Sequence, residues 1–307
     1  MGDVLSNILD TVALKAASYF HTDFRPPFGV ELPALPRTAR FHLALQGSCW
    51  VQLGSGASAR LSPGDLVLVP HGAAHRLLSA EGAPAAMLAT PPVVSPLRAG
   101  QGPAESACRL VCGHFTVAAG ADHPLLRALP ELIHITAPDR ARQPMLDEIV
   151  GLITRRLAAG DAGATTSISR LSEVLFIEMM HASVAQAPAI ARIMAAVHDP
   201  QIGRALSLIH DDVASAWTVA RLASAAAMSR SRFAERFRAL VGLAPMHYVA
   251  EWRLQTALSL LNGGAVPVKV VAARVGFKSA AAFTRAFSAR YGVPPARLRR
   301  QRHDDTL

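Results

Sequence analysis

Two stretches near the C-terminal end of the chain carry side chains that suit contacts with DNA bases. Arginine can bond bidentately to guanine, and the methyl groups of alanine and threonine can contact thymine. The first stretch contributes Ser229, Arg230, Ser231, Arg232 and Arg236, and the second contributes Lys278, Ser279, Ala280, Ala281, Thr284 and Arg285. A single basic helix is more often only a solvated surface, so the elements that hold these residues decide the interpretation.

Both stretches lie in one sequence pattern that occurs twice. Phe233 and Phe237 recur as Phe283 and Phe287, at an offset of 50 residues. A constant offset of this size marks a duplicated supersecondary unit. In each copy a short apolar helix precedes a break and a second helix, whose aromatic pair at i and i+4 lies on one buried face. The pattern predicts two helix-turn-helix units, and the duplication favours DNA contacts over a solvated surface.

The ends of the second helix in each copy have matching capping residues. Ser229 and Ser279 precede the helices, where a hydroxyl group can accept hydrogen bonds from free backbone amides. Gly242 and Gly292 follow them, where a helix commonly ends in the left-handed conformation. The caps therefore predict the same helix length in both copies.

Residues 200 to 300 resemble the DNA-binding domain of the AraC/XylS family of bacterial transcription regulators, most specifically from Ala272 to Pro295. The resemblance implies a long helix at about 245–261 that joins the two units, so that both recognition helices enter successive major grooves of double-stranded promoter DNA. It also implies a homodimer that activates transcription through RNA polymerase. Glu235 departs from the family pattern, because a basic residue is usual at that position.

The distribution of charge agrees with an anionic partner for the C-terminal third. Residues 201–307 contain 16 Lys and Arg against 6 Asp and Glu, a net charge of +10, whereas residues 1–200 contain 15 against 16, a net charge of −1. These two values give the net charge of +9 for the whole chain. This asymmetry predicts that a polyanion binds to the C-terminal third and not to the rest of the chain.

The region between Phe24 and Phe115 has short extended runs separated by Gly, Pro and Ser, which indicates an antiparallel barrel or sandwich. The predicted strands are 41–45, 49–53, 59–61, 66–69, 75–78, 85–89 and 109–117. The segment from Gly64 to His75 resembles the second sequence motif of the cupin barrel, although Ser79 replaces the usual Asn at its end. The resemblance implies a cupin-like sensor domain.

A metal or redox function for this domain depends on a few histidines and cysteines. A cupin barrel could bring His42, His75 and Cys112 together as ligands of zinc or another transition metal. Oxidant sensing by Cys49, Cys108 and Cys112 is the second interpretation. Cys108 and Cys112 would lie about 13 Å apart on one strand, too far for a mutual disulfide. The third interpretation is structural packing, with His42 pointing away from the barrel interior.

The first cupin motif is mostly missing, because only His42 is available from its set of histidines and glutamate. We therefore expect no enzyme activity, and a cupin-type metalloenzyme fused to a DNA-binding domain is the disfavoured alternative. A purely architectural DNA-binding protein is a further alternative, which the size of the N-terminal region argues against. The odd number of cysteines and the absence of a signal peptide or long apolar run predict a cytoplasmic protein without a membrane anchor.

The remaining elements predict the domain order. Apolar spacing predicts a helix over residues 4–20, and two helices at about 144–158 and from Ser167 or Ser169 to His181 form the expected dimerisation element. The predicted fold is α+β with two domains: a cupin-like antiparallel β-barrel with flanking helices, and an all-α domain with two helix-turn-helix units. The sensor domain covers residues 1–185, the linker 186–200 and the DNA-binding domain 201–307.

Overall fold

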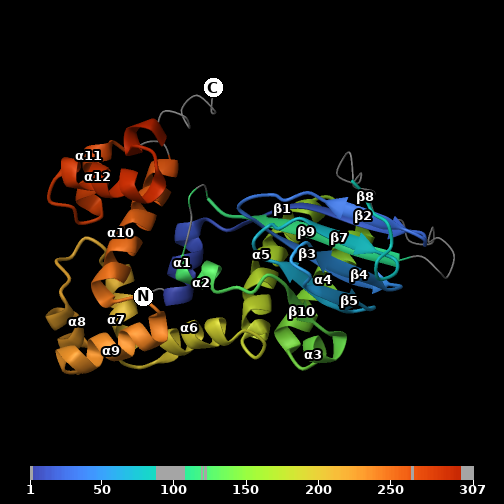
Figure 1. Cartoon of the computed structure of the whole chain (residues 1–307), viewed down its shortest axis with the longest axis horizontal. Helices are drawn as coiled ribbons and strands as arrows, with labels where there is room; N and C mark the ends of the chain where they lie inside the picture. The colour runs from blue at the N-terminus through green and yellow to red at the C-terminus, as the bar shows by residue number, and fades with distance from the viewer. Residues whose placement is uncertain (1–2, 88–107, 119, 121–122, 264–265, 299–307) are drawn as a thin grey trace. The chain divides into compact units, whose positions relative to one another are not determined.

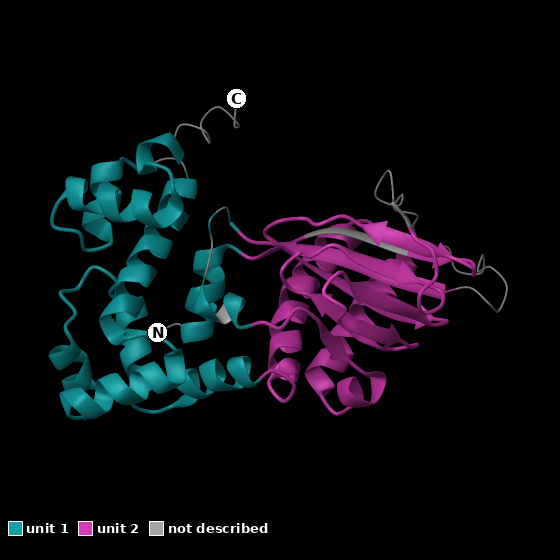
Figure 2. Cartoon of the chain, in the orientation of Figure 1, with its two compact units in different colours: residues 1–13, 118–128, 188–307 teal, residues 14–117, 129–187 magenta. Residues whose placement is uncertain are grey.

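The computed structural model describes residues 3–87, 108–118, 120, 123–263 and 266–298. These divide into two compact units, one helical and one of mixed helix and strand (Figures 1 and 2). Unit 1 consists of residues 1–13, 118–128 and 188–307, and unit 2 consists of residues 14–117 and 129–187. Two segments from the N-terminal half of the chain thus belong to the same unit as the C-terminal helices. The predicted boundary at residues 186–200 does not account for these two segments.

Unit 2 contains two five-stranded sheets. The first sheet has the order β1 (Lys15–Phe24), β9 (Cys108–Thr116), β3 (Thr38–Gln46), β6 (Leu66–Val69) and β10 (Ile133–Ile135). The second has the order β5 (Ser58–Leu61), β4 (Cys49–Leu53), β7 (His75–Leu78), β2 (Gly29–Leu32) and β8 (Ala86–Met87). All pairs of neighbouring strands are antiparallel except β2 and β8.

The core of unit 2 lies between the two sheets. Alternate side chains point inward from both of them, including Val51 of β4, Val67 of β6 and Leu110 of β9, each with no exposed surface. On the outer face of the first sheet, the rings of Phe41 and Phe115 make a tilted contact, and Phe115 makes another with Phe176 of helix α5 (Ala164–Ser183). The core between the sheets and the aromatic cluster under α5 therefore lie on opposite faces of β3 and β9.

The prediction of a closed barrel is wrong for the described strands, because they form two separate sheets. Closure requires every edge strand to have a hydrogen-bonded neighbour. The edge strands β1 and β10 of the first sheet have no such neighbour in the second sheet among the described residues. The structure is therefore a sandwich of two sheets packed face to face.

The N-terminal helix is shorter than its apolar spacing predicts. Helix α1 (Val4–Val12) begins after the Asp3 cap and ends at Ala13, which adopts the left-handed conformation with φ of 49°. From Lys15 the chain forms β1, which pairs with β9 over its whole length. The prediction of a helix up to residue 20 is wrong because this long-range pairing outweighs the local apolar spacing. Strands β2 and β10 were also absent from the predicted set.

Helices α4 (Pro144–Ala159) and α5 of unit 2 lie at the predicted positions except for one boundary, whereas the short helix α3 (Ala137–Ala141) was not predicted. Helix α3 precedes α4, which begins at Pro144 as expected. Helix α5 begins at Ala164, earlier than Ser167 or Ser169, because Gly163 takes the left-handed conformation immediately before it. Helices α4 and α5 pack together, and α5 lies against the sheet at β1 and β10.

Unit 1 is helical among its described residues. Its helices are α1, α2 (Pro124–Arg127), α6 (Pro188–His198), α7 (Ile202–Asp211), α8 (Val219–Ala225), α9 (Arg230–Val241), α10 (Pro245–Asn262), α11 (Val268–Arg274) and α12 (Ala280–Tyr291). The pairs α8–α9 and α11–α12 are the two predicted helix-turn-helix units, joined by the predicted long helix α10. No single described helix is long and apolar enough to cross a membrane, although α5 and α6 pass that test jointly as a bent pair.

Candidate DNA interface and candidate sensor site

Helices α9 and α12 are equivalent elements that present the predicted DNA-contacting side chains. Each has 12 residues. The hydroxyl group of Ser229 accepts a hydrogen bond from the Arg232 amide at 3.4 Å, and that of Ser279 accepts one from the Ala282 amide at 3.2 Å. Gly242 and Gly292 end the helices with φ of 84° and 72°. The capping predictions are therefore confirmed in both copies.

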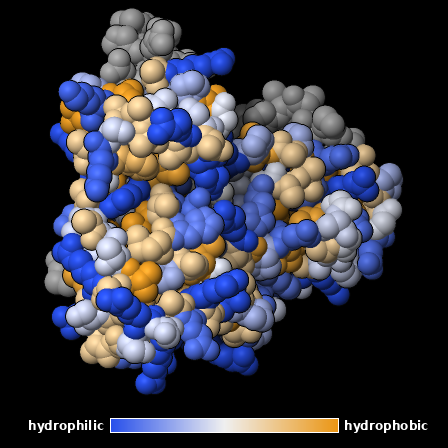
Figure 3. All heavy atoms as spheres, turned by 60° about the vertical axis from the view of Figure 1, so that its left-hand side comes forward, coloured by the Kyte–Doolittle hydropathy of each residue, from blue (hydrophilic) through white to orange (hydrophobic). Residues whose placement is uncertain are grey.

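Burial of the aromatic pairs determines which faces remain accessible. Phe233, Phe237, Phe283 and Phe287 have no exposed surface. The predicted contact residues consequently lie outward: those exposed are Ser229, Arg230, Ser231, Arg232, Arg236, Lys278, Ser279, Ala281 and Arg285, and those half-buried are Ala280 and Thr284. Figure 3 shows hydrophilic side chains interspersed with apolar ones on the face of unit 1 that is turned towards the viewer. Cations on both helices are thus available to a polyanion.

Arg236 has a partner that the sequence did not indicate. Its guanidinium group pairs with the carboxylate of Asp199, with Nε at 3.2 Å and Nη2 also in contact. The other oxygen of Asp199 accepts the amides of Gln201 and Ile202 at 3.0 and 2.8 Å. Burial pushes the pKa of Asp199 up, but these hydrogen bonds outweigh it and lower the pKa overall. Arg236 therefore anchors α9 to the start of α7.

A second set of predicted residues meets inside unit 2. His42 of β3 is directly opposite Cys112 of β9, and its Nδ1 lies 3.0 Å from the sulfur of Cys112. Its Nε2 lies 2.8 Å from Nε2 of His75 on β7, in the other sheet. Nδ1 of His75 lies 2.9 Å from the carbonyl oxygen of Ala73. His42 therefore points into the sandwich core, and the alternative that it points away is wrong.

The contact with Ala73 fixes the direction of every hydrogen bond in this chain. A carbonyl oxygen only accepts, so Nδ1 of His75 donates and its Nε2 is the acceptor. Nε2 of His42 must then donate to His75, which leaves Nδ1 of His42 to accept the thiol hydrogen of Cys112. We call this series of hydrogen bonds from Cys112 through His42 to His75 the thiol-imidazole chain. It satisfies its polar groups with neutral side chains alone.

Burial keeps the three groups neutral. It lowers the pKa of His42 well below its ordinary value, with His75 and Arg40 adding repulsion. It lowers the pKa of His75 to about 4, against the opposing effect of the Ala73 hydrogen bond. It also raises the pKa of the Cys112 thiol. Cys112 is consequently a protonated thiol at neutral pH, which is neither the reactive nor the metal-binding form.

The same geometry bears on metal binding. Within the described ranges, no group of three or more His, Cys, Asp and Glu side chains is arranged to hold a metal ion. The donor types of His42, His75 and Cys112 suit zinc, but His42 directs one nitrogen to each neighbour. A single ion cannot bind both nitrogens of one imidazole ring. The predicted residues are thus brought together without converging on one point.

The other two thiols form a separate contact between the sheets. Cys49 of β4 hydrogen-bonds to Cys108 of β9, which raises the pKa of Cys49 and lowers that of Cys108. Both side chains are 1% exposed and no disulfide joins them. The three predicted redox residues therefore comprise one adjacent pair, Cys49 and Cys108, and Cys112 in the thiol-imidazole chain.

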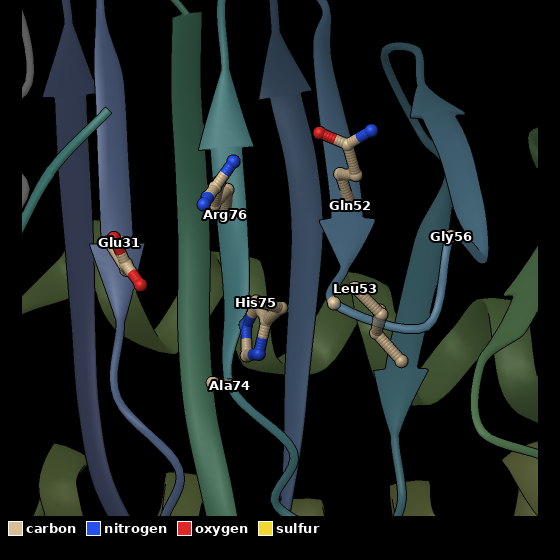
Figure 4. A pocket seen from close by; sticks show the side chains of 8 residues that line it. Glu31, Gln52, Leu53, Gly56, Ala74, His75 and Arg76 are labelled. Atoms are coloured by element: carbon tan, nitrogen blue, oxygen red, sulfur yellow. The ribbon is translucent and has the colours of Figure 1, made fainter. Parts of the chain in front are cut away.

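A pocket of about 290 Å³ is lined by His75 and by residues of β2, β4, β7 and the turn after β4 (Figure 4). Its polar lining comes from Glu31 of β2, Gln52 of β4 and Arg76 of β7. His75 also lines the pocket, although only 1% of its surface is exposed. A small polar species in this pocket would therefore lie next to the end of the thiol-imidazole chain.

Comparison with known proteins finds a different family model for each half of the chain. A family model described as Cupin matches residues 3–185, and one described as Helix-turn-helix domain matches residues 222–301. An AraC-like transcription regulator of Streptomyces antibioticus is 31% identical over 86% of this chain and 88% of its own length. The HTH-type transcriptional regulator AlkR of Acinetobacter baylyi is 30% identical, with 97% of this chain and 99% of the relative covered.

A third relative, the RCS-specific HTH-type transcriptional activator RclR of Escherichia coli, is 27% identical over 91% of this chain and 89% of its own length. These relatives are transcription regulators, and the alternative of a fused metalloenzyme finds no support among them. The duplicated helix-turn-helix units, the sandwich that precedes them and these relatives lead to one conclusion: the chain belongs to the AraC/XylS family of DNA-binding transcription regulators, with an N-terminal cupin-type domain.

Proposed function

We propose that this regulator reads promoter DNA with the outward faces of α9 and α12. The observation that carries the proposal is that two capped helices of equal length both expose cations opposite a buried aromatic pair. Arg230 and Arg232 are the base-contacting candidates on α9, and Lys278 and Arg285 are those on α12. None of these four side chains forms an ion pair with another described residue. Arg236 positions α9 through Asp199.

A mobility-shift titration with DNA from the chain's own promoter tests this reading. Replacing Arg232 by alanine removes about 1 to 3 kcal/mol of discrimination if the residue contacts a base, whereas loss of a phosphate contact weakens binding to all sequences alike. Arg204→Ala is the matched control, because Arg204 is an exposed arginine of α7 outside both recognition helices. The proposal would be contradicted if the Arg232 variant bound promoter DNA as tightly as the parent does, and random DNA as tightly as well.

We propose further that unit 2 senses the signal at the thiol-imidazole chain, and that the regulator then activates transcription with RNA polymerase. The pocket lined in part by His75 borders this otherwise buried chain, and we propose it as the place where a small species would bind. Zinc or another transition metal is the first candidate signal, because two imidazoles and a thiol are suitable donors. Binding would require Cys112 to lose its proton and His42 to reorient.

Metal analysis of the untagged protein tests this candidate. We expect stoichiometric metal in the parent protein and reduced metal in the His75→Ala and Cys112→Ser variants. Cys49→Ser serves as the control, because Cys49 lies outside the thiol-imidazole chain. Absence of metal from the parent protein after incubation with zinc would exclude a metal signal.

An oxidant is the second candidate signal, and the Cys49–Cys108 contact favours it. Oxidation by a peroxide would remove one hydrogen from each thiol, form the S–S bond and reduce the peroxide to two molecules of water. The disulfide would join β4 to β9 and so link the two sheets. Mass spectrometry after mild peroxide or hypochlorite treatment tests this idea: an intact Cys49–Cys108 pair together with unchanged DNA binding would refute it.

We also propose a homodimer formed through α4 and α5, acting in the cytoplasm, where bacterial promoter DNA lies. Large apolar side chains are exposed on these helices: Met145 at 57%, Leu152 at 41% and Val174 at 41%. Met145 and Leu152 are seven residues apart, on one face of α4. Leu152→Glu should shift the protein from dimer to monomer in sedimentation, and an unchanged dimer would place the interface elsewhere.

A further inference from the structure

The DNA-binding unit contains two segments that the sequence assigns to the sensor. Helix α1 packs on α7 and α10, with Val4, Ile8 and Val12 buried. Residues 118–128 belong to the same unit, and the amide of Ala118 donates to the carbonyl of Val12 at 2.9 Å. We call α1, Ala118, Gly120 and residues 123–128 together the docked segments. They pack on α7 and α10, the helices before and after the first helix-turn-helix unit in the chain.

His123 contributes a buried polar contact between the docked segments and α10. Its Nε2 lies 3.3 Å from the hydroxyl oxygen of Tyr248, which lies 2.8 Å from Nε2 of His210 on α7. The Tyr248 hydroxyl group has one hydrogen, so it donates to one histidine and accepts from the other. Burial lowers the pKa of His123 well below its ordinary value and that of His210 to about 3, so both rings are neutral and suit this arrangement.

The aromatic rings around this contact lead to the first recognition helix. His123 lies edge-on to Tyr248 and Trp252, with ring centroids 6.0 and 5.8 Å apart. Tyr248 in turn makes an edge contact at 5.7 Å with Phe237, the core anchor of α9. His123 therefore contacts a ring that packs directly against the helix proposed to read DNA.

Gly120 makes a second close approach. A Cβ atom at this position would lie 2.9 Å from Cδ2 of Leu258 on α10 and 3.4 Å from Cδ1 of Tyr291 on α12. Its φ of 78° is also unfavourable for other residues. Gly120 thus lies against the long helix and the second helix-turn-helix unit, whereas the docked segments reach the first unit through Tyr248.

The docked segments continue directly into the strands that carry the proposed sensor. Helix α1 precedes β1, and residues 118–128 follow β9, whose Cys112 is four residues before the end of the strand. The ends of these two strands are paired, with Lys15 opposite Thr116. A change in pairing near Cys112 can therefore be transmitted through the covalent chain to both docked segments.

We infer that α1, Ala118, Gly120 and residues 123–128 form an internal docking element, seated on α7 and α10 through His123 and Gly120. This element holds both helix-turn-helix units in their DNA-binding arrangement. The exposed cations of α9 and α12 remain accessible in this docked state, so docking supports DNA binding and does not block it. Undocking lowers DNA affinity. The further step, in which a signal at Cys112 changes the docking, rests on the function proposed above.

The test uses the full chain without any added signal and a duplex from its own promoter. His123→Ala and Gly120→Ala should each weaken DNA binding about tenfold, within the usual range of coupling between sites. His247→Ala is the control for the first variant, because His247 is an exposed histidine of α10. Gly82→Ala is the control for the second, since Gly82 has a similar φ of 75° but no atom within 4 Å of the added Cβ. Both controls should bind like the parent.

Hydrogen exchange of the parent protein provides an independent measurement that needs no substitution. Because coupling is reciprocal, bound promoter DNA should slow the exchange of amides in α1 and at residues 123–128. The inference would be overturned if saturation with DNA left the exchange of these amides unchanged. It would also be overturned if His123→Ala exchanged these amides faster than the parent but bound DNA with the same affinity. Neither result depends on metal or oxidant, so failure of the proposed signal is distinguishable from failure of docking.

Discussion

Replacing Phe287 by alanine tests the assignment of the buried face of α12. Phe287 has no exposed surface, and its ring lies 5.4 Å from that of Phe283 and 4.6 Å from that of Tyr291. A Phe to Ala change in a packed core costs about 3 to 5 kcal/mol through lost burial and the cavity left behind. The two aromatic contacts place the expected loss in the upper part of that range, because each adds roughly 0.5 to 1.5 kcal/mol.

Urea unfolding followed by tryptophan fluorescence measures this loss. Trp217 and Trp252 lie in unit 1, whereas Trp50 lies in unit 2. A Trp50→Phe background therefore restricts the signal to the unit that contains α12. Ser288→Ala is a suitable control, since Ser288 is the next residue of α12 and lies outside the aromatic pair. A loss below about 1 kcal/mol, combined with abolished DNA binding, would show that Phe287 faces DNA and that the burial assignment is wrong.

Three further outcomes follow from named contacts. Asp199→Ala and Arg236→Ala should each lower the free energy of unfolding of unit 1 by roughly 1 kcal/mol. The double variant should lose less than the sum of the two, because the residues share one ion pair. Strictly additive losses in urea unfolding would contradict the pairing. Gly292→Ala should destabilise unit 1 by about 1 kcal/mol because its φ is 72°, and an unchanged unfolding midpoint would argue against the left-handed cap. The pKa of histidine is about 6.5 in the unfolded chain but about 4 for folded His75, so acid favours the unfolded chain. The free energy of unfolding of unit 2 should therefore fall by on the order of 3 kcal/mol between pH 6.5 and pH 4, with no further loss from this residue at lower pH. A His75→Gln variant with the same pH dependence as the parent would refute this.

The sequence alone determined the elements whose specification is local. Phe233 and Phe237, their repeat 50 residues later, and the serine and glycine caps specify two helices within a few turns of chain. Helix periodicity and capping depend on neighbours three or four residues away, so they can be read without a tertiary structure. The same holds for α4, which begins at Pro144.

Strand pairing and buried polar contacts were decided by the tertiary structure. The spacing of residues 15–20 favoured a helix, but pairing with β9 makes them part of a strand. The face of His42 was likewise decided only by the position of β3 between β9 and β6. The Arg236–Asp199 pair joins residues 37 positions apart, and His123 meets Tyr248 across 125 positions. No periodic pattern encodes such separations, because they arise only when distant segments fold against one another. The sequence thus identified the two helices proposed to read DNA, whereas the folded chain determined which segments pack around them.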